Sequence, residues 1–372
     1  MTSMKINFFI ASMLCMATSS AFSSPKFYGE IDTSIDYIPE KNANSADRDT
    51  WKMNSNSSFL GIKGEEKLTS RLSALYLIEW AFNADGDGTD WSHRDRYIGL
   101  KDEKFGTLKV GKNNSPLKKM SSAVDSFNNY MRNTADVRGI MPGENRINNS
   151  VVYDSPKITV SDEANLAFSV LLATGEAQGI ASSQGGVTVD GNGLGDAWST
   201  SLTYTSPMFL AGIAYDKAIP SNFLGRGFLN AADPHIDINR VFAAANTIRL
   251  TSLIKPIEGM ELKALIQTSE VEEASGNQAG AANIDQSVGW LVGAEYRLSN
   301  DSKWNVKAQY SQNSTRFKND DANYDAKQIM AGVDYLFNKQ VKAYGYTAYA
   351  SFKQADLEDK QPVIGTGLEF KF

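Results

Sequence analysis

Apolar and polar residues alternate along almost the whole chain, from Lys26 to Phe372. In the stretch FYGEIDTSIDY, which starts at Phe27, one parity carries Phe, Gly, Ile, Thr, Ile and Tyr. The other parity carries Tyr, Glu, Asp, Ser and Asp. Successive side chains of a β-strand point to opposite faces, so this period of two predicts a strand with one apolar and one polar face. The same split recurs in WNVKAQYS, residues 304–311.

The connections between these stretches alternate between short and long. Residues 102–105 and 337–340 make short connections, whereas 176–195, 219–239 and 271–284 are long and rich in Gly, Asn, Asp and Ser. A transmembrane β-barrel combines both regularities, because its strands separate lipid from water and its turns are short at one rim only. We therefore predict an all-β fold, a 16-stranded antiparallel transmembrane barrel. The expected strands are 26–38, 57–66, 70–82, 93–102, 105–112, 148–156, 163–175, 196–206, 208–218, 240–253, 259–270, 285–298, 302–313, 325–337, 340–353 and 361–372.

A soluble β-sandwich or a β-propeller is the alternative fold. Neither explains the alternating connection lengths, and no fixed-period repeat supports a propeller. The chain length alone would suggest two globular domains. The sequence shows no linker, no shift in composition and no block of helical periodicity, so one barrel over residues 24–372 is expected.

Residues 1–23 have the three parts of an export signal. Lys5 is the charged part, residues 6–16 form a short apolar core, and Ala21-Phe22-Ser23 is a cleavage site of small residues. The only cysteine, Cys15, lies inside this signal, so the mature chain has neither disulfides nor a thiolate metal site. Cleavage removes Lys5 and shifts the net charge from −6 to −7. That balance argues against a nucleic-acid partner.

Two segments resemble ligand-binding loops without meeting their requirements. The segment from Asp85 to Asp90 lacks the glycine at the sixth position of a calcium loop, and Arg96 replaces the glutamate at the twelfth. The glycine-rich residues 190–196 lack the strand–turn–helix context of a phosphate loop. The only histidines, His93 and His235, suggest an outer-membrane hydrolase as an enzyme alternative. Ser92 cannot pair directly with His93, because adjacent strand residues point to opposite faces. We expect no enzyme, no metal and no cofactor.

The chain resembles the general porins of Gram-negative bacteria, especially the Neisseria-type trimeric porins. The matching motifs are SFLGIKGEE at 58–66, RYIGLK at 96–101, Phe105-Gly106, VGK at 110–112 and NSVVYDSP at 149–156. The chain also ends in a strand with Leu368, Phe370 and the terminal Phe372 on one face. This ending is similar to the signal that the outer-membrane assembly machinery recognises.

The resemblance implies a trimer of water-filled barrels, in which the third long loop folds inward and narrows each channel. Residues 113–147 match that loop, and its acids Asp125, Asp136 and Glu144 would face basic residues of the wall. Alternation along the strands places Lys63, Lys109, Arg146 and Glu30 inside. Arg94 and Arg96 share one parity, which the family match places toward the lumen. Two departures from the family stand out, because Phe59 and Glu30 occupy positions where relatives carry basic residues.

The resemblance implies passive diffusion of small hydrophilic solutes and ions across the outer membrane of a Gram-negative bacterium. The implied partners are a second and third copy of the chain, outer-membrane lipids, lipopolysaccharide and the assembly machinery. A solute-specific channel and a non-conducting structural or adhesive barrel stay open as alternatives. The inward-facing acids Glu30, Asp32 and Asp36 favour a weak cation preference.

Overall fold

The computed structural model describes residues 24–39, 50–88, 90–176, 193–224, 242–273, 281–299, 302–319 and 321–372. The expected export signal at 1–23, His235 and the first part of the 190–196 segment lie outside the described residues. In the described part of the chain, no helix is long and apolar enough to cross a bilayer.

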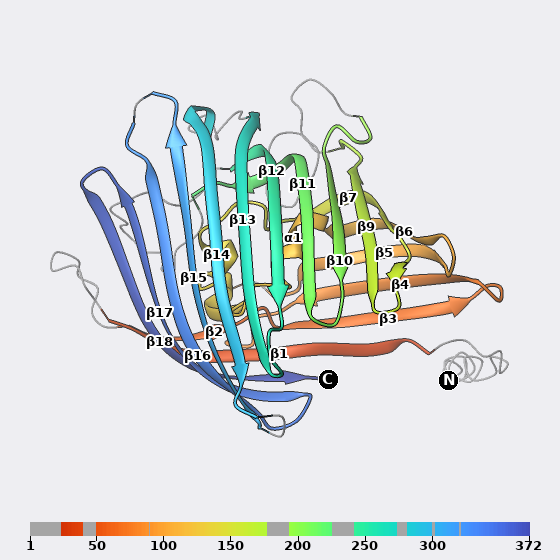
Figure 1. The fold of residues 1–372 in the computed structure, drawn as a ribbon, viewed down its shortest axis with the longest axis horizontal. Coiled ribbons are helices and arrows are strands. Elements are labelled where there is room, and N and C mark those ends of the chain that lie inside the picture. The colour runs from red at the N-terminus through yellow and green to blue at the C-terminus, as the bar shows by residue number, and fades with distance from the viewer. Residues whose placement is uncertain are drawn as a thin grey trace, which may run out of the picture.

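Antiparallel strands make up most of the described chain (Figure 1). Their bounds agree with the expected spans to within a few residues at most ends. The strands are β1 Lys26–Ile38, β2 Thr50–Ser55, β3 Phe59–Lys67, β4 Leu72–Ala81, β5 Ser92–Asp102, β6 Gly106–Asn114, β7 Arg146–Asp154, β8 Ile158–Ser161, β9 Ala164–Ala173, β10 Trp198–Thr205, β11 Phe209–Asn222, β12 Phe242–Ile254, β13 Met260–Glu273, β14 Ile284–Arg297, β15 Trp304–Phe317, β16 Tyr324–Leu336, β17 Val341–Gln354 and β18 Leu357–Lys371.

Two strands of the barrel are each interrupted. β2 and β3 both pair with β1, at Ile35 with Met53 and at Gly29 with Leu60, and the left-handed Ser57 (φ 64°) lies between them. β7 and β8 likewise both pair with β9. Counting each pair once gives sixteen strands, and the pairing of β1 with β18 closes the ring. The predicted closed 16-strand antiparallel barrel is therefore confirmed.

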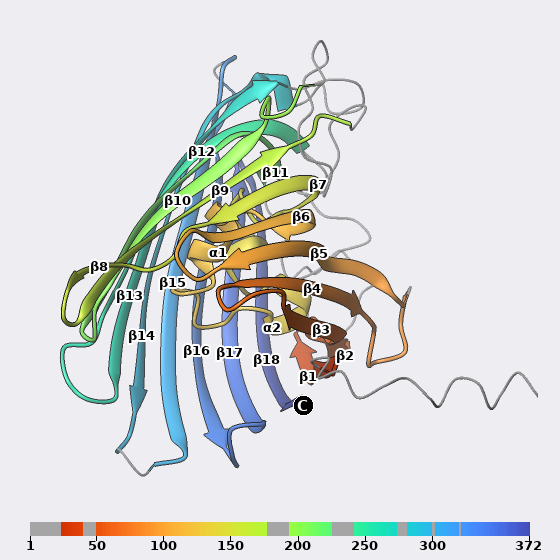
Figure 2. The same ribbon diagram turned by 90° about the vertical axis from the view of Figure 1, so that its right-hand side faces the viewer.

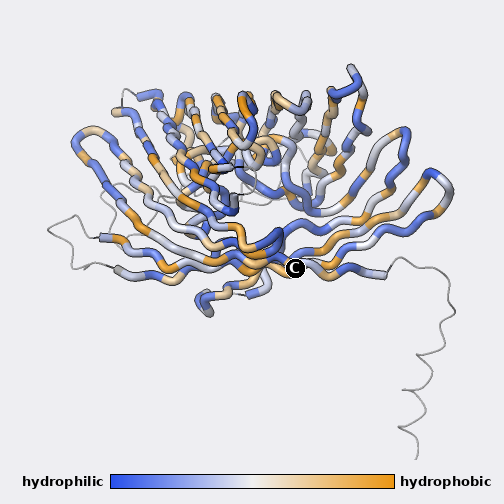
Figure 3. Tube along the Cα trace, turned by 60° about the horizontal axis from the view of Figure 1, so that its bottom comes forward, coloured by the Kyte–Doolittle hydropathy of each residue, from blue (hydrophilic) through white to orange (hydrophobic). Residues whose placement is uncertain are grey.

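The two faces of the sheet differ as the alternation predicts. Ile98, Ile266 and Ile329 are 62%, 53% and 55% exposed on the outer face, whereas Ser311 and Gln328 on the inner face are fully buried. Figure 3 shows the same alternation of hydrophilic and hydrophobic positions along the strands. An outer apolar face beside a polar interior is the arrangement of a barrel that meets lipid outside and water inside.

The connection between β6 and β7 packs against the inner face of the sheet. It contains α1 Pro116–Ser121, α2 Tyr130–Asn133 and a 3₁₀ turn at Val137–Gly139. Figures 1 and 2 both show α1 within the curve of the sheet. We call residues 115–145 the inner segment, which is two residues shorter at each end than the predicted loop. Its apolar side chains form the main core with wall residues; the core includes Val124, Phe127, Tyr130, Ile140, Leu265, Leu291, Met330, Tyr344 and Tyr346.

The two chain ends of the barrel meet at the closing seam. The Gly29 N–H donates to the Phe372 carbonyl (3.0 Å), and the Phe372 N–H donates to the Gly29 carbonyl (3.1 Å). Leu368, Phe370 and Phe372 are 50%, 40% and 43% exposed on the outer face. The terminal residues thus have the outward orientation that was expected.

Gly29→Ala should lower the yield of folded barrel. A Cβ at position 29 would lie 2.5 Å from the Phe59 carbonyl and 2.7 Å from the Phe372 ring, so the seam would have to open. Gly345→Ala is the matched control, because its Cβ would meet only the Gly365 carbonyl at 3.9 Å. Heat-modifiable gel mobility after refolding in detergent measures the folded fraction. Equal yields for the two variants would contradict a tight seam.

Candidate functional site

A buried arginine of the wall holds the inner segment in place. Arg249 on β12 is fully buried, and its Nη1 lies 2.5 Å from Glu144 Oε1. The same guanidinium donates to the carbonyls of Leu117 (3.2 Å) and Pro142 (3.0 Å) and to Gln267 Oε1. Arg249 was not among the residues expected from the sequence. An arginine between Ile248 and Leu250, in an apolar strand, was the available indication that a buried partner must exist.

The acids of the inner segment serve mainly to fold it. Asp125 accepts hydrogen bonds from the Phe127 and Val137 N–H groups and from Gln309 Nε2. Asp136 accepts from the Asn129 and Gly139 N–H groups, both at 3.2 Å. Both carboxyls are buried, so they do not form the row of exposed negative charge that was expected to face the basic wall.

Burial sets the ionisation of these acids. It raises the pKa of Asp125, and it raises the pKa of Asp136 to about 7, with the nearby charge of Asp125 as the next cause. Burial alone would also raise the pKa of Glu144. The charges of Arg249 and Lys118 outweigh that effect and hold the pKa of Glu144 below its usual range.

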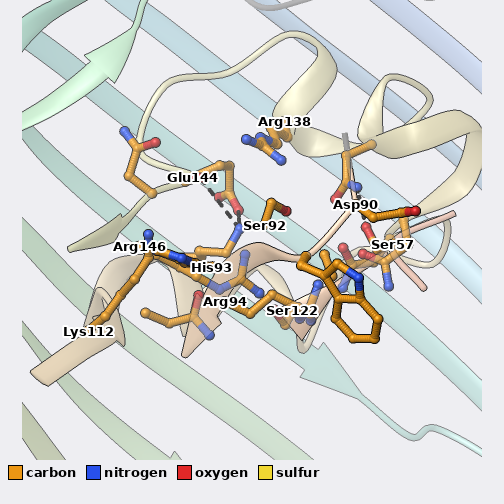
Figure 4. A pocket seen from close by; sticks show the side chains of 18 residues that line it. Ser57, Asp90, Ser92, His93, Arg94, Lys112, Ser122, Arg138, Glu144 and Arg146 are labelled. Carbon is orange, nitrogen blue, oxygen red and sulfur yellow. Dashed lines mark hydrogen bonds and ion pairs between the residues drawn. The ribbon is translucent and has the colours of Figure 1, made fainter. Parts of the chain in front are cut away.

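A basic cavity lies between the inner segment and the wall formed by β5, β6 and β7. It has a volume of about 700 Å³, and Figure 4 shows the side chains that surround it. Five lysines and arginines contribute to its lining, against two acids, Asp90 and Glu144. The basic side chains are Arg94, Lys112, Lys118, Arg138 and Arg146.

The two arginines that were expected at the constriction both line this cavity. Arg94 Nε lies 3.2 Å from Glu79 Oε2, and its guanidinium is 4.4 Å from the centre of the Phe59 ring. Arg146 Nε lies 2.7 Å from Asp95 Oδ1. Within the described residues, the hydrogen bonds of both arginines run through Nε. Their terminal amino groups are therefore available to a solute.

Arg96 does not lie where the alternation placed it. The register of β4 with β5 shifts next to the pair of Ile78 with Arg96, where a β-bulge adds one residue to β5. The extra residue reverses the parity, so Arg96 shares the outer face with the exposed Ile98. Its guanidinium lies 5.2 Å from the centre of the Trp80 ring. The prediction that Arg94 and Arg96 share one face is wrong.

The remaining predicted wall residues lie on the inner face, outside the cavity. Lys63 lies over the Tyr28 ring at 4.2 Å, and Lys109 forms an ion pair with Asp154 at 2.5 Å. Glu30 lies 3.6 Å from Lys371. Lys112, Lys118 and Arg138, which the sequence analysis did not select, line the cavity in their place.

Two of the acids that were expected to attract cations are buried beneath other side chains. Asp32 and Asp36 are 1% and 0% exposed, and they accept hydrogen bonds from the hydroxyls of Tyr344 (2.5 Å) and Tyr346 (2.6 Å). Tyr130 of the inner segment stacks on Tyr344 with ring centres 4.6 Å apart. The inner segment therefore shields this wall from the open part of the barrel.

Among the described residues, one cluster of carboxylates has the spacing of a metal site. Oxygens of Glu30, Asp32 and Glu369 lie within 4.8 Å of one another. Lys342 lies 2.9 Å and Lys371 2.8 Å from Glu369, and the Tyr344 hydroxyl donates to Asp32. The protein itself thus neutralises and satisfies these acids.

Glu144→Gln and Arg249→Gln should be strongly coupled in a double-mutant cycle. Glu144→Gln leaves the buried Arg249 without its carboxylate, and Arg249→Gln leaves Glu144 with only the more distant Lys118 at 3.6 Å. Breaking a buried pair in this way costs about 3–5 kcal/mol in unfolding free energy, and the double variant should recover part of that loss. The exposed pair Arg316 and Asp285, at 2.7 Å, is the control, with an expected coupling of about 0–1 kcal/mol. Denaturant unfolding in detergent measures both cycles. A coupling no larger than the control's would show that Arg249 does not hold the segment.

Raising the pH from 5 to 8 should destabilise the inner segment through Asp136. Folding raises the pKa of this carboxyl from 3.8 to about 7, so the folded state binds more protons than the unfolded state between these values. Stability is therefore lost as the pH rises through this window. Asp136→Asn should lessen the pH dependence of the unfolding midpoint, whereas Asp285→Asn at the exposed pair should not. Identical pH profiles for wild type and Asp136→Asn would contradict this assignment.

Comparison with known proteins agrees with the barrel geometry. The family model described as Gram-negative porin matches residues 11–355. The major outer membrane protein P.IA of Neisseria meningitidis serogroup A is 26% identical over 314 residues, 78% of this chain and 75% of that protein. The P.IB protein of Neisseria gonorrhoeae is 34% identical over 102 residues, so the chain matches only 29% of that relative's length and 27% of its own.

The solved structure titled anion-selective porin from Comamonas acidovorans has a TM-score of 0.66 and 19% sequence identity. The match covers 94% of this chain and 100% of the Comamonas chain. At that identity the likeness establishes the fold alone. The family match spans most of the sequence, and the chain therefore belongs to the Gram-negative porin family.

Proposed function

We propose that this outer-membrane barrel is a channel for passive diffusion of small hydrophilic solutes and ions. The observation that carries the proposal is the basic cavity of about 700 Å³ between the inner segment and the wall. A polar passage lined by fixed charges admits hydrated solutes, and it penalises apolar ones because they would displace ordered water. Transport of this kind needs no cofactor and no catalytic step.

The inner segment acts as the constriction in this proposal. Its contacts span a large part of the inner wall, since the Tyr130 hydroxyl donates to Asp334 at 3.1 Å and the Ser126 N–H donates to Gln309 at 2.9 Å. These contacts leave the solute path beside β5, β6 and β7, where Arg94 and Arg146 lie. A rigid constriction keeps the pore width constant without moving parts.

The charge of the lining favours anions over cations. Asp32, Asp36, Asp125 and Asp136 are buried in hydrogen bonds, and Glu144 is paired with Arg249. The cavity keeps five basic side chains. We therefore propose an anion preference in place of the weak cation preference expected from sequence, because acids that are paired or hydrogen-bonded away from the path act less on a passing ion than charges that line the path.

The family resemblance is the basis for the proposed assembly and oligomeric state. We propose a homotrimer embedded among outer-membrane lipids and lipopolysaccharide, with the exposed Leu368, Phe370 and Phe372 recognised by the assembly machinery. Their outward orientation at the closing seam supports that role. A solute-specific channel is the second candidate, favoured by the five basic side chains that line one cavity. Conductance in planar bilayers separates both channels from a non-conducting structural barrel.

Replacing Arg94 and Arg146 together by glutamine should shift the reversal potential under a salt gradient toward cations. It should also raise the flux of bulkier solutes, because two long side chains leave the path. The matched control is Arg71→Gln with Arg316→Gln, which removes the same charge from exposed ion pairs outside the cavity. Planar bilayer recordings measure the shift. If both double variants behave alike, the two arginines do not line the path of the ions.

A further inference from the structure

Three cations of the cavity have N–H donors that no described residue accepts from. Lys112 Nζ forms no ion pair or hydrogen bond with any described residue, and Arg94 and Arg146 each use only Nε. Arg146 repels both Arg94 and Lys112, and the carboxylates of Glu79 and Asp95 offset only part of that repulsion. Figure 4 shows the three side chains gathered at one side of the cavity. Like charges held together raise the free energy of the empty site, and an anionic group bound among them would relieve that cost.

The same cavity offers an acceptor that an anion without a hydroxyl group cannot use. Asn114 Nδ2 donates to Asp95 at 2.9 Å, which fixes the orientation of the amide. Its Oδ1 is buried and has no hydrogen-bond partner. A buried acceptor without a donor is costly, so a ligand that carries a hydroxyl group next to its anionic group would complement Asn114.

An exposed aromatic residue completes the lining. Trp91 is 57% exposed, and its backbone has a φ of +63°, which a bulky side chain rarely adopts. Such strained conformations concentrate at functional sites. The flat indole face suits the apolar C–H face of a sugar ring, and a cavity of about 700 Å³ is within the range that holds a small ligand.

We propose that the cavity is a saturable binding site for hydroxylated organic anions, with sugar phosphates as the class that it fits. The cations Arg94, Lys112 and Arg146 would bind the phosphate, Asn114 would accept from a hydroxyl, and Trp91 would pack on the ring. This inference rests on the proposed channel function and adds binding to diffusion.

Glucose 6-phosphate is the probe, added to single channels of the full-length protein in planar bilayers. We expect a saturable block of the ion current, with much weaker block by glucose and by inorganic phosphate. Lys112→Gln should raise the half-blocking concentration about tenfold, as expected for loss of one charge-assisted hydrogen bond. Lys101→Gln is the matched control, because Lys101 is paired with Glu65 at 3.2 Å outside the cavity.

Asn114→Ala tests the hydroxyl acceptor separately. It should weaken the block by glucose 6-phosphate and leave any block by sulfate unchanged, because sulfate has no hydroxyl group to donate. Heat-modifiable mobility confirms that each variant folds. Equal half-blocking concentrations for Lys112→Gln and Lys101→Gln, or a phosphate block as strong as that of the sugar phosphate, would overturn the proposed site. Conducting channels without any saturable block would reject the site and leave the diffusion channel intact, whereas no conductance at all would reject both.

Discussion

The structure depends on one constraint, that every backbone N–H and C=O group of the barrel must find a partner within the sheet. Hydrocarbon offers no hydrogen bonds, so a spanning sheet cannot keep a free edge. The pairing of β1 with β18 removes the last two edges. Gly29 is needed at that seam because a side chain there would meet the Phe59 carbonyl and the Phe372 ring. The closed ring then fixes the wall against which the inner segment can fold.

Ionisable side chains inside the ring fall into two groups with different tasks. The first group is buried and holds the inner segment, as in Arg249 with Glu144 and Asp125 with Gln309. The second group consists of Arg94, Lys112 and Arg146. These side chains line the cavity and have N–H donors that no described residue uses. Composition alone gives both groups equal weight, yet in the proposed channel only the second would act directly on a passing solute. The acidic net charge of the chain therefore says little about the charge along the path.

Period-two alternation was sufficient to predict the strands, because one face must be apolar along the whole length of each. It located β1 at Lys26–Ile38 with the same bounds as the structure. Alternation gave the wrong face for Arg96, because a single β-bulge reverses the two faces of the strand and no residue type predicts a bulge. Arg249 was missed for a different reason. Its role depends on Glu144, more than a hundred residues away, and a pairing over that distance leaves no local pattern in the sequence.

That separation also has a consequence for the order of folding. Arg249 lies 105 residues beyond Glu144, and Asp334 lies 204 residues beyond Tyr130. Contacts between such distant parts of a chain form late, because the entropy of closing the intervening loop must be overcome first. The inner segment cannot form its contacts with Arg249 and Asp334 until β12 and β16 have paired within the sheet. Strand pairing must therefore run far around the ring before the inner segment reaches its final position and the passage acquires its final shape.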